Sequence, residues 1–159
     1  PACFAVAGSC VRQDGKSASL TAPNGQAQTG MLQGALADAA TSPEDVAQNE
    51  AHGTGTGLGD PIEVRSLANA VLCSCEPSAP LALGSIKANV GHAEPAAGAA
   101  GLLRLAIGLL GDSAPPNAQL RTLNPHLGDT LKMCTVMLHV QFAALPRIAA
   151  VREDTAIGG

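Results

Sequence analysis

The stretch EAHGTGTGLGDP, residues 50–61, places four glycines within seven positions directly after a histidine, His52. Such a run can cradle a phosphate, let a substrate pass close to the backbone in a tight turn, or simply connect a strand to a helix. The glycines alternate, so neither the G-x-G-x-x-G nor the G-x-x-x-x-G-K-[ST] nucleotide pattern fits them. Phosphate binding is therefore disfavoured, whereas a bare turn leaves the histidine and the two threonines of the stretch unexplained.

The composition indicates one domain with a core of small aliphatic side chains. The chain has 159 residues, 46% of them apolar, but only two Phe and no Trp or Tyr. Its net charge of −4 argues against a nucleic-acid partner. The longest apolar segment, 96–110, contains Arg104 and is too short to span a membrane. We expect a soluble, cytoplasmic protein, or a plastid one if the source is a eukaryotic alga.

The five cysteines have neither disulfide-framework spacing nor a second pair that would complete a zinc site. We interpret them as buried or idle thiols in a reducing compartment, and we expect no metal. They are Cys3, Cys10, Cys73, Cys75 and Cys134.

The order of the predicted elements indicates an α/β fold. A short buried strand is expected over 4–11, and a strand over 46–51 leads into His52. An apolar stripe predicts a helix over 26–40. One further turn follows Ser42, which we expect to act as its N-cap.

The sequence DPIE after the glycines is typical of a helix start. Asp60 is predicted as the N-cap, Pro61 as the first helical residue and Glu63 as the residue reaching back to the cap, with the helix running to about Leu72. The remaining predicted elements are a strand and loop in 79–92, a helix apolar on nearly all sides and hence buried over 95–110, and strands in 133–142 and 147–151.

A second constellation, GSIKANVGH, places Lys87 five residues before His92, after a predicted strand and before a helix. Proteins of the α/β class place their sites at such strand ends. His126 and His139 are interpreted as histidines without a role in this site.

Three segments carry a family resemblance: VRQDGKSASLTAPNG (11–25), NEAHGTGTGLGDPIE (49–63) and LGSIKANVGHAEPAAGAAGLL (83–103). They resemble the β-ketoacyl synthase (ketosynthase) domain of type I, modular polyketide synthases. The resemblance extends over about 8–127. It implies a thiolase-like fold with α-β-α-β-α layers and two similar halves, of which 1–159 corresponds to the second half plus the last strand of the first.

The resemblance also implies roles for individual residues. His52 and His92 would donate hydrogen bonds to a thioester oxygen while malonyl is decarboxylated, and Lys87 would support His92 electrostatically. Thr54 and Thr56 would bind the phosphopantetheine arm of an acyl carrier protein, so no cofactor is bound directly. A homodimer is expected through the full domain. We expect the two histidine rings to converge and Lys87 to point towards them.

The nucleophilic cysteine of the family lies in a motif that none of the five cysteines matches, so we expect 1–159 alone to be inactive. The family's Gly-Phe-Gly-Gly-Thr-Asn segment is also replaced here, by Ala156-Ile157-Gly158-Gly159. Two alternatives remain: a ketosynthase of a fatty acid synthase, and a degenerate ketosynthase that only binds carrier protein or shapes a dimer. Half of a two-half fold would expose an apolar face, so we expect the isolated chain to associate.

Overall fold

A sheet of three parallel strands organises the structure, a computed structural model that describes residues 4–17, 19, 22–72, 81–111, 113–128 and 130, and the backbone of 139–140 and 145–146. The strand order is β1 (Gln48–Glu50), β2 (Ala82–Gly84), β4 (His139–Val140). Glu50 at the end of β1 lies opposite Gly84 at the end of β2. The segments that follow the two strands therefore leave the sheet at the same edge.

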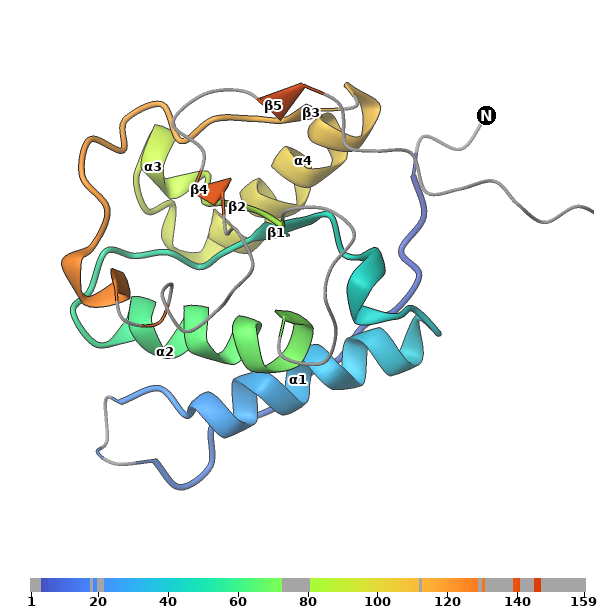
Figure 1. The fold of residues 1–159 in the computed structure, drawn as a ribbon, viewed down its shortest axis with the longest axis vertical. Coiled ribbons are helices and arrows are strands. Elements are labelled where there is room, and N and C mark those ends of the chain that lie inside the picture. The colour runs from blue at the N-terminus through green and yellow to red at the C-terminus, as the bar shows by residue number, and fades with distance from the viewer. Residues whose placement is uncertain are drawn as a thin grey trace, which may run out of the picture.

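Helices cover both faces of this sheet (Figure 1). Helices α1 (Gly25–Asp38) and α2 (Gly59–Leu67) pack side by side on one face, and α4 (Ala97–Leu110) packs against β1 on the other. Strands β3 (Ser113–Ala114) and β5 (Leu145–Pro146) form a separate antiparallel pair. The remaining elements are the short helix α3 (Lys87–Val90), a π-helical turn (Ala68–Leu72) and three 3-10 turns (Pro43–Asp45, Glu94–Ala96, Pro125–Leu127).

The core between the sheet and α2 is aliphatic, as the composition predicts. Leu81 and Leu83 around β2 are buried against Val64 and Leu67 of α2 and against Leu127. No helix of the described residues is long and apolar enough to cross a membrane.

Several predicted elements are confirmed. The helix predicted over 26–40 is α1, whose first free N–H groups are capped by the side chain of Asn24. The turn after Ser42 is present, although the Ser42 side chain makes no capping hydrogen bond. Strand β1 is shorter than the predicted 46–51, and the α-helix after the glycines continues to Leu72 with π geometry.

The buried strand predicted over 4–11 is wrong. The described residues 4–11 pair with no strand, and Val6 and Val11 are 71% and 94% exposed. The segment runs along α1, where Gly8 lies so close to the backbone of Ala35 and Ala39 that a Cβ would be 2.5 Å from atoms of each. Small residues on both sides of this contact thus replace the sheet pairing that the apolar pattern suggested.

Two further predictions need correction. The 95–110 helix is not buried on all sides: Gly101 and Arg104 of α4 face the sheet, but its opposite face exposes large apolar side chains. These are Leu102, Leu103, Ile107, Leu109 and Leu110. The loop predicted after β2 contains the helix α3, because the backbone of 85–91 closes successive turns. Strand β4 falls within the predicted 133–142, whereas 147–151 lies outside the described residues.

Candidate functional site

The structure brings His52 and His92 together. Their ring centroids lie 5.4 Å apart and the ring planes meet at 85°, an edge-to-face arrangement. His52 follows β1, and His92 follows β2 and α3, so the parallel register of the two strands places both loops at one edge of the sheet. The convergence expected from the sequence is confirmed.

The backbone determines which nitrogen of His92 carries a proton. The Nδ1 atom accepts a hydrogen bond of 3.0 Å from the backbone N–H of Glu94. An accepting ring nitrogen has no proton, so the neutral imidazole carries its proton on Nε2. The chain bends sharply here, with φ of +79° at Gly91 and +48° at Glu94. His92 is thereby set to donate from Nε2.

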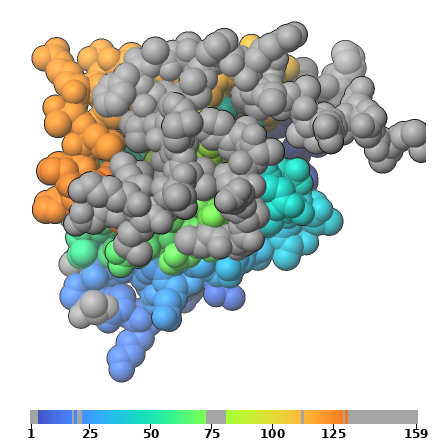
Figure 2. All heavy atoms as spheres, in the orientation of Figure 1, coloured from blue at the N-terminus to red at the C-terminus, as the bar shows by residue number. Residues whose placement is uncertain are grey.

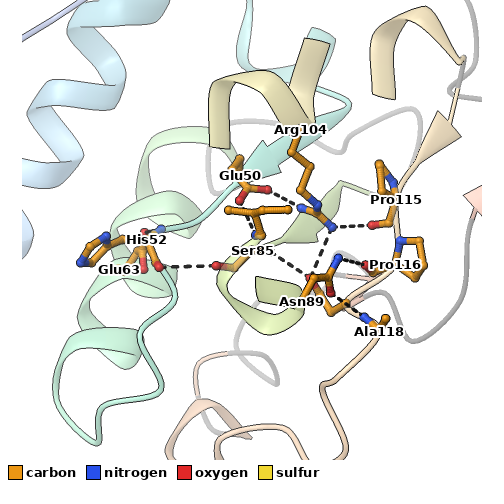
Figure 3. A network of polar contacts seen from close by, with 11 residues as sticks. Glu50, His52, Glu63, Ser85, Asn89, Arg104, Pro115, Pro116 and Ala118 are labelled. Atoms are coloured by element: carbon orange, nitrogen blue, oxygen red, sulfur yellow. Dashed lines mark hydrogen bonds and ion pairs between the residues drawn. The ribbon is translucent and has the colours of Figure 1, made fainter. Parts of the chain in front are cut away.

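The carboxylate of Glu63 holds the backbone of the His52 loop. It accepts hydrogen bonds from the N–H groups of His52 at 2.6 Å and Gly53 at 2.9 Å. On the other side, the Ser85 hydroxyl donates to the His52 carbonyl at 3.4 Å. Figure 3 shows the His52 ring pointing away from these contacts. The loop is fixed through its main chain, which leaves the imidazole free for a ligand.

Glycine is required at specific positions of the loop. Gly53 has φ of +50°, and a Cβ there would lie 2.9 Å from the Cβ of Ser85. Gly55 has φ of +78°, a conformation that L side chains rarely adopt. Of the three interpretations of the glycine stretch, these φ values and contacts fit the tight turn, and the passage of a substrate along its backbone stays a prediction.

Asp60 holds the second half of the same loop. Its Oδ1 accepts from the N–H of Gly55 and its Oδ2 from the side-chain amide of Asn124, each at 3.1 Å. Asn124 also donates to the Thr56 carbonyl at 3.1 Å. The predicted capping roles of Asp60 and Glu63 are therefore wrong: α2 begins at Gly59, and both carboxylates bind N–H groups of the glycine loop instead. The N–H groups of the glycine loop have no hydrogen-bond partner in a sheet or helix, and the two carboxylates supply one.

Both threonines of the glycine loop are exposed. The Thr56 hydroxyl accepts a hydrogen bond from the Gly59 N–H at 3.1 Å. Thr54 lines a pocket of about 350 Å³ together with His52 and Glu63. Met31 and Leu32 of α1 form part of its apolar wall. Thr54 thus faces the same space as His52.

Lys87 is the first residue of α3 and is half-buried. Its carbonyl accepts from the N–H of Gly91, which closes the turn before His92. The approach of its ammonium group to the histidines remains a prediction.

Sequence reasoning missed a buried ion pair beneath the site. Arg104 of α4 pairs with Glu50 of β1, and their side chains are 3% and 7% exposed. The other Glu50 oxygen accepts from the N–H of Ile86 at 2.5 Å, and Arg104 also donates to the Pro115 carbonyl. The ion pair therefore ties the end of β1 to the segment that begins α3 (Figure 3).

Two asparagines join this network to residues 116–118. The Asn117 side-chain oxygen accepts from the N–H of Ser85 at 2.9 Å and from Arg104 at 3.4 Å. Asn89 donates to the Pro116 carbonyl at 3.1 Å and accepts from the N–H of Ala118 at 2.7 Å. The sequence signal for this network is a single arginine within the apolar 96–110 segment, because a buried charge requires a partner.

Comparison with known proteins defines the class. The family model described as "Beta-ketoacyl synthase, C-terminal domain" matches residues 3–121, so the chain belongs to this family. The chain is 42% identical over 149 residues to a phenolphthiocerol/phthiocerol polyketide synthase of Mycobacterium tuberculosis, covering 92% of this chain and 8% of that protein. It is also 42% identical over 127 residues to "Erythronolide synthase EryA3" of Saccharopolyspora erythraea, covering 80% and 4%.

Solved structures agree with this assignment. The chain matches the oxazolomycin ketosynthase domain OzmH KS7 of Streptomyces albus with a TM-score of 0.81 and 33% identity, covering 92% of this chain and 25% of that one. The ketosynthase from module 6 of the Bacillus subtilis bacillaene synthase gives 0.80 and 30%, covering 92% and 26%. The chain is the second half of the duplicated, thiolase-like α/β fold of polyketide synthase ketosynthases, and it spans only a small part of each relative.

Proposed function

We propose that residues 1–159 supply the histidine half of a ketosynthase active site that extends polyketide chains by decarboxylative Claisen condensation. The observation that carries the proposal is the convergence of two imidazoles at 5.4 Å, with Nε2 of His92 left to donate. Fixed donors aimed at one oxygen stabilise developing charge without having to reorganise.

The reaction would proceed in two stages, decarboxylation and condensation. The bond between the malonyl carbon and its carboxylate breaks, CO₂ leaves, and the electron pair remains as an enolate whose oxygen accepts from His52 and His92. The enolate carbon then attacks the acyl thioester on a cysteine supplied from outside this chain. The tetrahedral intermediate collapses, releases the cysteine thiolate and leaves the extended β-ketoacyl chain on the carrier protein.

The other predicted site residues fit supporting roles. Lys87, as a cation at the turn before His92, would stabilise the negative charge that develops at the histidines. Thr54, at the wall of the pocket that holds His52, and Thr56 on the same loop would hydrogen-bond the phosphopantetheine arm of an acyl carrier protein. The complete domain would work as a homodimer.

Two other functions fit the same fold: a ketosynthase of a fatty acid synthase, and a non-condensing ketosynthase that binds carrier protein. The relatives named above are polyketide synthases, which favours polyketide extension. The hydrogen bonds from the His52 loop to two carboxylates, Glu63 and Asp60, favour a working site over a degenerate one.

The test replaces each histidine in the complete ketosynthase domain. His52→Ala and His92→Ala should each slow decarboxylation of malonyl carrier protein by roughly 10²–10³, the cost of one oxyanion donor. Acylation of the cysteine should suffer less. Glutamine at either position, which retains an N–H donor, should recover part of the loss, whereas alanine should not.

Two results would contradict this proposal. Unchanged decarboxylation in both alanine variants, with normal unfolding curves, would show that the converging rings have no part in the chemistry. A parent enzyme that binds carrier protein but never releases CO₂ would favour the non-condensing alternative.

A further inference from the structure

Arg104 lies at the centre of a buried network that the proposed mechanism does not use. Its guanidinium pairs with Glu50, donates to the Pro115 carbonyl and donates to the side-chain oxygen of Asn117 at 3.4 Å. Arg104 and Asn117 are both buried. A buried charge is tolerated only when its partners have accurate geometry. The guanidinium therefore holds each of these acceptors in one position.

Two glycines leave the space that the ion pair occupies. A Cβ on Gly84, the last residue of β2, would overlap the guanidinium of Arg104. A Cβ on Gly101, three residues before Arg104 on α4, would lie 3.0 Å from the Cγ of Glu50. A side chain at either position would push against the pair. The sheet and α4 are thus built around it.

Two acceptors held by Arg104 bind successive backbone N–H groups just before α3. The Asn117 side-chain oxygen accepts from the N–H of Ser85 at 2.9 Å, and Oε1 of Glu50 accepts from the N–H of Ile86 at 2.5 Å. Ile86 immediately precedes α3. The N–H groups at a helix start have no acceptor within the helix, so these two contacts fix where α3 begins.

The same contacts reach both histidine loops. Helix α3 has only four residues and ends two residues before His92, so a displacement at its start is passed on to His92. Ser85 also donates its hydroxyl to the His52 carbonyl at 3.4 Å, and Glu50 lies two residues before His52. Figure 3 shows these contacts between Arg104 and the His52 loop. The network thus links the two loops whose rings converge.

A second set of contacts holds α3 along its length. Asn89 of α3 donates to the Pro116 carbonyl and accepts from the N–H of Ala118. Residues 113–128, drawn in orange, lie along one edge of the molecule (Figure 2). Helix α3 is therefore held at its start by the buried network and beside it by a segment that reaches the surface.

We propose that Glu50 and Asn117 are positioning residues for the reaction: held by Arg104, they fix the start of α3 and thereby the distance between the imidazoles of His52 and His92. The inference rests on the proposed function for the reaction itself. Two donors must reach one oxygen, and a misplacement of about 1 Å can slow a reaction by about 10². Loss of these acceptors should therefore lower turnover rather than substrate binding.

The experiment compares two uncharged double variants of the complete ketosynthase domain. E50Q/R104M removes both charges but keeps a side-chain oxygen that can accept from the Ile86 N–H, whereas E50M/R104M removes that acceptor as well. The stability control is L72A, because Leu72 is buried in the core beside α2, on the other face of the sheet from α4. Three quantities are measured: kcat and KM for decarboxylation of malonyl carrier protein, the rate of cysteine acylation, and amide hydrogen exchange at Ile86.

E50M/R104M should lower kcat about ten- to a hundredfold, leave KM and cysteine acylation unchanged, and speed exchange of the Ile86 amide about tenfold or more. E50Q/R104M should be faster than E50M/R104M and should retain protection of that amide. L72A should keep the kcat of the parent per folded molecule. Equal kcat values in the two double variants, or a parent-like kcat in E50M/R104M, would overturn the proposal.

A second variant tests the same proposal if E50M/R104M does not fold. N117L removes the acceptor of the Ser85 N–H and leaves the ion pair in place. It should lower kcat without changing KM, and it should speed exchange of the Ser85 amide. A parent-like kcat with faster exchange at Ser85 would show that the position of α3 does not matter to the chemistry.

The two proposals fail in different ways. If the parent releases no CO₂ but protection of the Ile86 amide depends on the acceptor at position 50, the hold on α3 stands and the condensation function falls. If the parent condenses normally and E50M/R104M loses the protection but keeps the rate, the function stands and the positioning role falls.

Discussion

Replacing Arg104 by methionine should destabilise the complete ketosynthase domain far more than replacing any exposed arginine. The side chains of Arg104 and its partner Glu50 are 3% and 7% exposed, so the substitution leaves a buried carboxylate without a counter-charge. Breaking a buried pair from one side costs about 3–5 kcal/mol of the free energy of unfolding. The carbonyl of Pro115 loses a donor at the same time.

Urea unfolding of four proteins tests this reasoning: the parent, Arg104→Met, the double variant Glu50→Gln/Arg104→Met, and Arg121→Met as the exposed control. The control should remain within about 0.5 kcal/mol of the parent. The double variant should recover about 2 kcal/mol relative to Arg104→Met, because glutamine can still accept from the Ile86 N–H without being charged. A single variant within about 1 kcal/mol of the parent, or a double variant no more stable than the single one, would refute the role assigned to the pair.

Four further results are expected. In urea unfolding of the complete domain, Gly53→Ala should lower the free energy of unfolding by about 1–3 kcal/mol because of its positive φ and its contact with Ser85, and an unchanged value would contradict the requirement for glycine there. Glu63→Ala should slow decarboxylation by about ten- to a hundredfold in a single-turnover assay, since the His52 loop loses its acceptor and shifts; an unchanged rate would separate the loop from the chemistry. Lys87→Met should slow decarboxylation while leaving the urea midpoint unchanged, and an unaffected rate would show that its ammonium lies away from the histidines. Residues 1–159 expressed alone should elute as aggregates in size-exclusion chromatography because α4 exposes a leucine-rich face, and a monodisperse, cooperatively melting monomer would contradict this.

The motifs correctly predicted the fold class and the proximity of the two histidine rings, and the geometry of parallel strands explains why. Two loops that follow adjacent parallel strands must emerge at the same edge, so His52 and His92 converge wherever β1 and β2 pair in register. Helix periodicity located α1 within about two residues of its ends.

The wrong predictions have a common cause. A sequence pattern identifies a hydrogen-bonding or apolar side chain, but it does not show which of several possible partners that side chain contacts in the folded chain. Asp60 and Glu63 have the spacing of a capping box, yet the N–H groups of the preceding loop bind them instead. The apolar pattern of 4–11 indicated burial without indicating a neighbouring strand. Arg104 appeared to be an isolated charge, because its partner Glu50 lies 54 residues earlier in the chain.

The contact between Glu94 and His92 has a consequence for how this part of the chain can vary. Many catalytic histidines are oriented by a carboxylate, which can be deleted by mutation or neutralised by acid. Here the orienting group is a peptide N–H, which every residue except proline possesses and which does not titrate in water. The side chain at position 94 is thus free to change, provided that the residue tolerates φ of +48°, and the ring keeps its direction whatever the ionisation of its neighbours. Proline at position 94 would remove this donor, and because its ring fixes φ at about −65° it could not keep the φ of +48° found there, so the turn after His92 would change as well.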